Sequence, residues 1–98
     1  MSLELIRWER FIENSLQDPC LIVDLRNQAC YQKEHVKGAV SLPYTEWEGH
    51  WPHFPKEVPI YLYCDRGNAA LLVGRELDRK GYQAIAVMGG YPKPCDFE

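Results

Sequence analysis

Hydrophobic and polar positions follow two different periods along this chain, and together they predict alternating strands and helices. Apolar runs at 20–25 and 60–64 predict two strands, the first with the pattern of a strand that is covered on both faces, and residues 82–87 predict a third strand. Apolar residues three or four positions apart predict one amphipathic helix over 5–15 and a second over 69–80. This alternation predicts an α/β fold with a mainly parallel central sheet and helices on both of its faces.

Turn-forming residues separate these elements. Asp18 and Pro19 end the first helix, whereas Gly81 caps the second, because proline and glycine mark helix ends. Between the first two long strands, the pattern predicts a short helix or loop over 26–33, a turn with a short strand over 36–42, a helical turn over 44–49 and an ordered loop over 50–59.

The composition indicates one domain that spans residues 1–98, long enough for a single hydrophobic core. A net charge of -3 argues against nucleic acid or an anionic membrane as a partner. No apolar run approaches the roughly 18 residues of a membrane helix. The N-terminal residues are charged throughout and show no secretory signal, so we expect a soluble cytoplasmic protein.

The four cysteines are expected to be reduced thiols. A disulfide framework is possible in principle, but secretory context is lacking and the apolar content suffices for a core. No C-x-x-C motif supports a zinc or thioredoxin-like site. Cys20 and Cys30 are interpreted as structural or incidental thiols, and Cys95 as a tail residue or as a relay thiol for Cys64.

The strongest candidate for chemistry is Cys64, at the end of the second long strand. The loop that follows leads into the N-terminus of the helix predicted over 69–80, where free N–H groups and the helix dipole favour anions. Such a position favours the thiolate, which is the nucleophilic form of cysteine. The alternative is a buried cysteine that packs as a small hydrophobic residue.

Other candidate sites are weaker. His50 and His53 could suggest a metal pair, but Pro52 disfavours a helix between them and no ligand cluster completes a set, so no metal is expected. Gly89 and Gly90 lack a surrounding G-x-G-x-x-G motif, which argues against a dinucleotide site, and no cofactor is expected. Three aromatic residues are expected to pack over the sheet: Trp47, Trp51 and Phe54.

Four motifs occur in one order along the chain. They are Ile-Val-Asp-Leu-Arg at 22–26, Glu-His-Val-Lys-Gly-Ala-Val-Ser-Leu-Pro at 34–43, the strand and loop that contain Cys64, and Gly-Tyr at 81–82 followed by a strand and Gly-Gly. In this order and spacing the chain resembles the rhodanese-like (sulfurtransferase) family over nearly its whole length. The resemblance implies the family's three-layer α/β fold.

The resemblance also implies a function. Cys64 would accept a sulfane sulfur from a donor such as thiosulfate, hold it as a persulfide, and pass it to cyanide or to a thiol of a small molecule or protein. Arg66 would bind an anionic donor, and Gly67 would allow the tight loop. Backbone N–H groups would surround the persulfide and come from the loop residues Asp65, Arg66, Gly67, Asn68 and Ala69.

Three residues near the first two motifs are expected to give structural support. Arg26 would pair with a carboxylate such as Glu34 and orient the loop after the first long strand, which Asp24 ends. His35 is expected to be a hydrogen-bonded turn residue and not a general base.

The chain departs from the family pattern at several places. Ala69 and Ala70 stand where the family often has Ser or Thr, and Asp65 adds a carboxylate beside the thiolate, so thiosulfate turnover should be weakened. The usual terminal helix after Gly90 looks missing or altered. A Cys-based phosphatase would need Arg at position 70, and a non-catalytic binding or regulatory module of the same fold is the other alternative.

Overall fold

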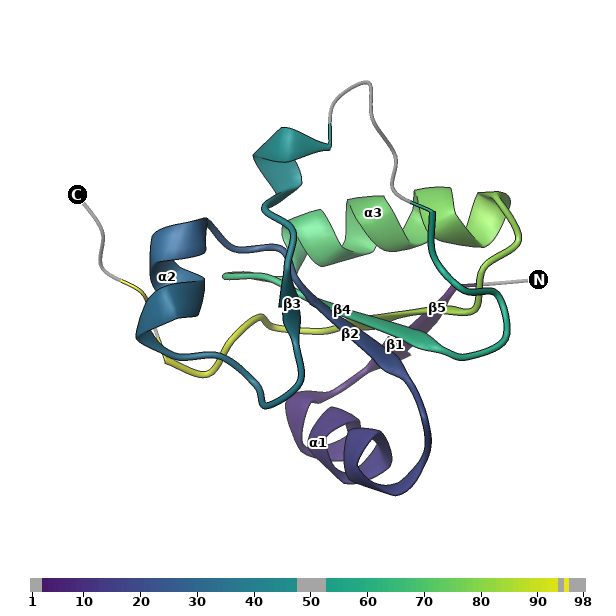
Figure 1. Cartoon of the computed structure of the whole chain (residues 1–98), viewed down its shortest axis with the longest axis horizontal. Helices are drawn as coiled ribbons and strands as arrows, with labels where there is room; N and C mark the ends of the chain where they lie inside the picture. The colour runs from purple at the N-terminus through teal and green to yellow at the C-terminus, as the bar shows by residue number, and fades with distance from the viewer. Residues whose placement is uncertain (1–2, 48–52, 94, 96–98) are drawn as a thin grey trace.

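The computed structural model describes residues 3–47, 53–93 and 95 of the chain. It consists of a central parallel sheet between two helical layers, as Figure 1 shows. The strands lie in the order β1-β5-β4-β2-β3. Their bounds are β1 Glu4–Ile6, β2 Leu21–Asp24, β3 Val40–Ser41, β4 Ile60–Tyr63 and β5 Ala84–Val87. The helices are α1 Trp8–Gln17, α2 Gln28–Lys33, the 3₁₀ turn η1 Tyr44–Glu46, and α3 Asn68–Arg79.

The two faces of the sheet build two separate hydrophobic cores. Helix α3 covers one face, where Val73 and Leu77 pack with Leu62 of β4. Helix α1 covers the other face, where Phe11 packs with Tyr61 of the same strand. Successive strand residues point to opposite faces, so a strand covered on both sides must be apolar throughout. This explains the continuous apolar runs, and it confirms the predicted α/β fold.

Most of the predicted elements are present. The long strands and the helix over 69–80 are confirmed within one or two residues, and a short strand and a 3₁₀ turn lie where they were expected. Gly81 has φ +95° and directly follows Lys80, the C-cap residue of α3, which is the usual place of a helix-ending glycine. None of the helices in the described residues has the length and hydrophobicity of a membrane span.

The first predicted helix was wrong at its N-terminal end. Residues Glu4–Ile6 form the edge strand β1, which pairs with β5, and the helix begins only at Trp8. Leu5 fits the helical spacing, yet it is half exposed in the strand. Pairing with β5 supplies backbone hydrogen bonds such as Met88 N–H to the Ile6 carbonyl (2.8 Å), and this long-range gain overrides the local period.

Candidate active site

The thiol of Cys64 lies where strand β4 ends and helix α3 begins. The residue is only 4% exposed. Its Sγ accepts hydrogen bonds from the backbone N–H groups of Gly67 (3.0 Å) and Ala70 (3.4 Å). Donors at a helix N-terminus stabilise negative charge on the atom they face. The site is therefore arranged to hold an anionic sulfur without a metal.

The donors match the expected set only in part. Gly67 belongs to the five loop residues that were expected to donate, whereas Ala70 lies just beyond them. Ala70 is fully buried and is the third residue of α3, so its N–H is one of the donors of the first helical turn that have no partner within the helix. It also occupies the position where a Cys-based phosphatase would need Arg. The loop therefore lacks the bidentate clamp that a transferring phosphate requires.

The segment that follows strand β5 packs against the Cys64 loop. The Tyr91 N–H donates to the Cys64 carbonyl (2.8 Å), and Gly90 lies so close to the loop that a Cβ there would overlap the Asp65 carbonyl. Gly67 and Gly90 both have positive φ, +90° and +80°. Gly90, the second residue of the pair that was set aside as a dinucleotide motif, thus has a different role, which is to let two backbone segments approach each other.

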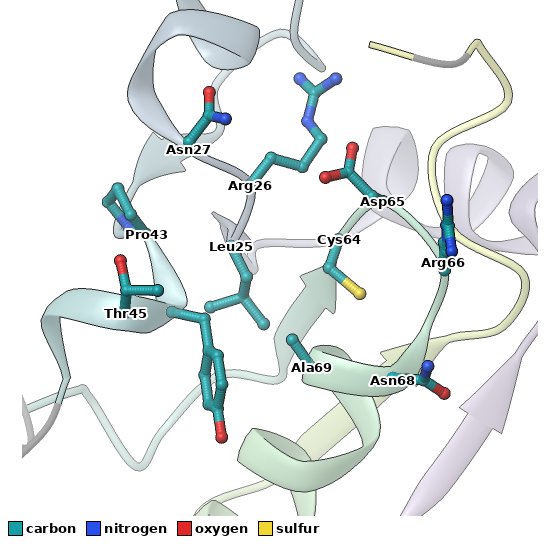
Figure 2. A pocket seen from close by; sticks show the side chains of 11 residues that line it. Leu25, Arg26, Asn27, Pro43, Thr45, Cys64, Asp65, Arg66, Asn68 and Ala69 are labelled. Atoms are coloured by element: carbon teal, nitrogen blue, oxygen red, sulfur yellow. The ribbon is translucent and has the colours of Figure 1, made fainter. Parts of the chain in front are cut away.

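Cys64 lines a pocket of about 470 Å³. Figure 2 shows its sulfur pointing toward the start of α3, with Ala69 and Leu25 nearby, while the exposed Arg66 side chain rises from the outer edge of the loop. The pocket walls come from the loop after β2, the segment around η1, and the Cys64 loop. The lining residues are Leu25, Arg26, Asn27, Pro43, Tyr44, Thr45, Cys64, Asp65, Arg66, Asn68 and Ala69.

The sequence patterns predicted only the wall of this pocket that the Cys64 loop forms. Leu25, Asn27, Pro43, Tyr44 and Thr45 were missed as pocket residues. Their signal was available, because they directly follow β2 and β3, and ligands of parallel sheets bind beyond the carboxyl ends of the strands. Spacing in the chain does not reveal which strand ends are neighbours.

A buried ion pair holds the loop after β2. Asp24 and Arg26 are 0% and 3% exposed, and Nη2 of Arg26 lies 2.8 Å from Oδ2 of Asp24. The Arg26 guanidinium also donates to the backbone carbonyl of Glu34 (2.6 Å) and lies 4.0 Å from the Tyr91 ring. Burial alone would lower the pKa of Arg26, but the hydrogen bond and charge of Asp24 outweigh it and raise that pKa.

The expected partner of Arg26 was therefore wrong. Its carboxylate partner is Asp24, and Glu34 offers only a main-chain oxygen, while the Glu34 carboxylate lies 3.3 Å from Lys93 Nζ. Because Arg26 is only two residues from Asp24, its side chain folds back onto the carboxylate and the pair stays buried. His35 is an exposed turn residue whose Nδ1 lies 2.7 Å from the Tyr31 carbonyl oxygen.

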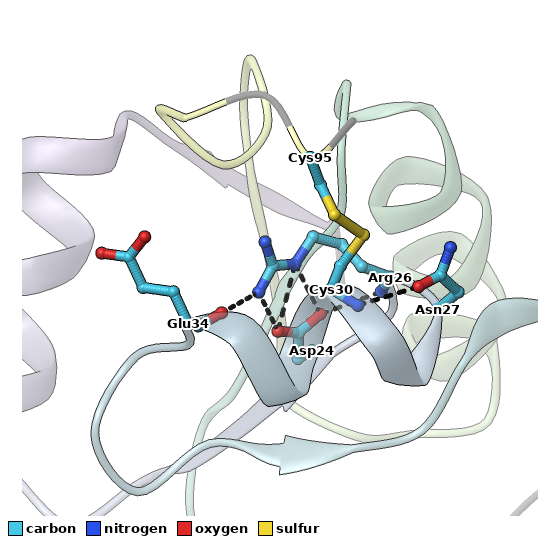
Figure 3. The surroundings of a disulfide bond; sticks show 6 residues. All are labelled: Asp24, Arg26, Asn27, Cys30, Glu34 and Cys95. Atoms are coloured by element: carbon cyan, nitrogen blue, oxygen red, sulfur yellow. Dashed lines mark hydrogen bonds and ion pairs between the residues drawn. A yellow bond between two sulfur atoms is a disulfide. The ribbon is translucent and has the colours of Figure 1, made fainter. Parts of the chain in front are cut away.

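The expectation of four reduced cysteines was also wrong. Cys30 of α2 forms a disulfide with Cys95, while Cys20 and Cys64 are free, as Figure 3 shows for the bonded pair. Cys95 is consequently not an isolated tail residue, and in this state it has no thiol that could relay sulfur from Cys64. The bond ties the segment after β5 to the helix that follows Arg26 and Asn27.

The remaining candidates are resolved in part. Trp47 is buried in the core beneath α3 and its ring packs near Phe54 (5.8 Å between centroids), as expected. Among residues 3–47, 53–93 and 95, no group of three His, Cys, Asp or Glu side chains could hold a metal ion. His50, Trp51 and Pro52 lie outside the described residues.

Comparisons with known proteins give one consistent result. The family model described as "Rhodanese-like domain" matches residues 9–94. A tRNA sulfurtransferase of Desulfurococcus amylolyticus is 31% identical over 77 residues, which are 79% of this chain and 15% of that protein. The thiosulfate sulfurtransferase GlpE of Coxiella burnetii is 28% identical over 72 residues, which are 72% of this chain and 67% of that protein.

A solved structure extends the likeness to the fold. The crystal structure of a Staphylococcus saprophyticus protein superposes with a TM-score of 0.78 at 26% identity, covering 89% of this chain and 88% of the other. The chain thus matches that protein over most of its length, whereas it spans 15% of the tRNA sulfurtransferase.

Proposed function

Because the chain belongs to the rhodanese-like domain family, we propose that it is a sulfurtransferase that carries a sulfane sulfur on Cys64. The observation that carries the proposal is the buried Cys64 Sγ, which accepts N–H hydrogen bonds from Gly67 and Ala70 inside a pocket. The printed names of two relatives, a tRNA sulfurtransferase and a thiosulfate sulfurtransferase, support the same class of reaction.

The reaction has two steps that use the same sulfur atom of Cys64. In the first step, the Cys64 thiolate attacks the outer sulfur of a donor such as thiosulfate. A new S–S bond forms, the S–S bond of thiosulfate breaks, and sulfite leaves with the electron pair. In the second step, cyanide or a thiolate attacks the terminal sulfur of the persulfide, and Cys64 leaves as a thiolate. Both proposed steps balance without a metal or a cofactor.

The surrounding residues are proposed to bind and position. The Gly67 and Ala70 N–H groups would stabilise the charge of the persulfide, because fixed donors in a water-poor site need no reorganisation during the reaction. Arg66 would attract an anionic donor to the mouth of the pocket. Asp24, Arg26 and His35 would position the segment after β2, which forms another wall of the pocket.

Sulfur loading tests the proposal directly. After incubation with thiosulfate, the intact mass should rise by one sulfur atom and return to its starting value when a thiol reductant is added. Cys64→Ser should not load, whereas Cys20→Ser, which removes the other free thiol, should load like the parent protein. Equal loading of Cys64→Ser would overturn the mechanism, and rapid arylphosphate hydrolysis would favour a phosphatase instead.

Location in the cytoplasm stays a prediction. The Cys30–Cys95 disulfide is the observation that speaks against it, because structural disulfides are rare in reducing compartments. Fractionation of source cells with an antibody against the protein, together with thiol labelling of the isolated protein, would test both the location and the bond.

A further inference from the structure

The segment that follows β5 touches the Cys64 loop through its backbone. The Tyr91 N–H donates to the Cys64 carbonyl (2.8 Å). One residue earlier, Gly90 lies so close to the Asp65 carbonyl that no side chain would fit. Both contacts are made at the residue that carries the reactive sulfur and at the residue after it. A shift of this segment would therefore move the loop whose N–H groups face the sulfur.

The same segment also touches a second wall of the pocket. The centre of the Tyr91 ring lies 4.0 Å from the guanidinium carbon of Arg26 and 5.6 Å from the centre of the Tyr63 ring. Arg26 is 3% exposed and is one of the residues that line the Cys64 pocket. The loop after β2 and the Cys64 loop therefore both pack against the segment after β5, and its position affects both walls.

The disulfide fixes this segment to α2, as Figure 3 shows. Cys95 is bonded to Cys30 in the first turn of α2. The Cys30 N–H donates to the side-chain oxygen of Asn27 (2.9 Å), which caps α2 and lines the pocket. The ion pair of Lys93 with Glu34 (3.3 Å) joins the same two segments, but it is exposed and therefore weak. Reduction of the disulfide would remove the stronger of these two links.

The bond is placed where a reductant can reach it without touching the reactive thiol. Cys30 is only 2% exposed, whereas Cys95 is half-buried, so a thiolate from solvent reaches the Cys95 sulfur first. Cys64 is not part of the bond and keeps its thiol in both states. Accessible disulfides are commonly labile or regulatory, and those of reducing compartments are usually catalytic or redox-sensing. The bond is therefore suited to report the redox state to the Cys64 pocket.

We propose that the Cys30–Cys95 disulfide is a redox switch that slows sulfur loading at Cys64 when a dithiol reduces it. The proposal rests on the proposed sulfurtransferase function. One thiolate of the dithiol attacks the Cys95 sulfur, a mixed disulfide forms, and Cys30 leaves with the electron pair and takes up a proton. The second thiolate of the dithiol then attacks its partner sulfur in the mixed disulfide, and Cys95 leaves as a thiolate. The dithiol is oxidised to a disulfide, and the two cysteines are reduced.

The test compares the full chain in its oxidised and reduced states. Dithiothreitol reduces the bond and is removed under anaerobic conditions before thiosulfate is added, because a dithiol would strip sulfur from Cys64. Intact mass then follows the rate of sulfur loading. The reduced protein should load about fivefold more slowly, which is the lower end of the usual coupling between two sites. Cys95→Ser, which leaves the buried Cys30 in place, should load slowly with or without the dithiol treatment.

Hydrogen exchange gives a readout that does not depend on sulfur chemistry. Reduction should speed the exchange of the Tyr91 amide, because its hydrogen bond to the Cys64 carbonyl is then less firmly held. The control amide is that of Ile60, which donates to the Gln83 carbonyl (2.8 Å) at the other end of β4 and should keep its rate. A matching rise at both amides would indicate general destabilisation and would overturn the switch.

The control variant is Lys93→Ala, which removes the exposed ion pair between the same two segments but keeps the disulfide. It should change neither the loading rate nor the exchange of the Tyr91 amide. Equal loading rates in the oxidised and reduced parent protein would overturn the switch. Failure of the oxidised parent protein to load sulfur would instead overturn the proposed function. In that case the Tyr91 exchange still decides whether the disulfide acts on the Cys64 loop, and equal exchange in both states would contradict it.

Discussion

Cys20 and Cys64 are the two free thiols in the described part of the chain, and they lie at opposite ends of neighbouring parallel strands of the sheet. Cys20 directly precedes β2, whereas Cys64 directly follows the neighbouring strand β4. The Cys20 thiol lies 3.9 Å from the Ser15 carbonyl oxygen, near the C-terminal end of α1. The Cys64 sulfur faces N–H groups at the N-terminal end of α3.

This difference shows how a parallel fold assigns chemistry to identical side chains. A helix C-terminus presents carbonyl oxygens, which favour a protonated thiol, and a helix N-terminus presents N–H groups, which favour an anion. Burial and the charge of Asp18 both raise the pKa of Cys20. Strand direction therefore decides at which end of the strands a reactive thiol lies, because in βα units the helix N-terminus follows the carboxyl end of the strand.

The largest expected effect concerns the ion pair behind the Cys64 pocket. Asp24→Asn leaves the buried Arg26 guanidinium without its counter-charge, which should reduce the free energy of unfolding by about 3–5 kcal/mol. Equilibrium unfolding in urea measures this loss. The control is the double variant Asp24→Leu with Arg26→Met, which removes both charges and should lose less. If Asp24→Asn is as stable as the parent protein, the ion pair does not stabilise the loop after β2.

The disulfide should be next in magnitude. Cys30→Ser removes a link between residues 65 positions apart, and loops of such length are expected to contribute about 2–4 kcal/mol through the unfolded chain. Thermal unfolding under oxidising conditions measures the change, and Cys20→Ser is the control that removes a thiol without removing a bond. An added reductant should lower the melting temperature of the parent protein but leave that of Cys30→Ser unchanged.

A glycine pair tests whether the Cys64 edge depends on close backbone approach. Gly89 and Gly90 have nearly equal φ, +81° and +80°, but a Cβ has open space at Gly89 and overlaps the Asp65 carbonyl at Gly90. Gly89→Ala should cost only the positive-φ strain of roughly 1–2 kcal/mol. Gly90→Ala should cost more and should slow sulfur loading, because the Cys64 loop must shift. Equal loading rates in the two variants would contradict this role of Gly90.

A smaller effect is expected at Arg66. Its side chain is exposed, so the loss of its charge in Arg66→Ala should weaken thiosulfate binding by at most about 1 kcal/mol, roughly a fivefold rise in KM. Steady-state formation of thiocyanate measures this value. Raising the salt concentration should reduce the difference between the variant and the parent, because exposed charges are screened. A KM that does not change in Arg66→Ala would assign donor binding to the backbone.

The smallest effect concerns the unreactive thiol. Burial is the main cause of the raised pKa of Cys20 and Asp18 the lesser one, so Asp18→Asn should lower that pKa slightly and speed alkylation of Cys20 about twofold at neutral pH. Because the pKa of this thiol is higher in the folded than in the unfolded protein, it contributes stability at any pH below the unfolded-state pKa. This contribution is lost as the pH rises through the folded-state pKa. Peptide mapping after iodoacetamide treatment separates the Cys20 and Cys64 rates.

Local patterns in the sequence determined the main strands, the helix α3 and the position of Cys64 between a strand and a helix. These features depend on short-range periodicity and on turn residues such as Gly67 and Gly81, whose conformational freedom is a local property. The chemistry of a thiol at a helix N-terminus also follows from local order, so Cys64 was found before any contact was known.

Only the tertiary structure decided which distant segments meet. Three features depend on pairing between residues far apart in the chain. They are the strand at Leu5, the bond between Cys30 and Cys95, and the close packing of Gly90 on the Cys64 loop. The sheet order places the ends of β2, β3 and β4 at one edge, and this brings Tyr44 to the Cys64 pocket. The period of a sequence reports which face of an element is buried, but it carries no information about its neighbours.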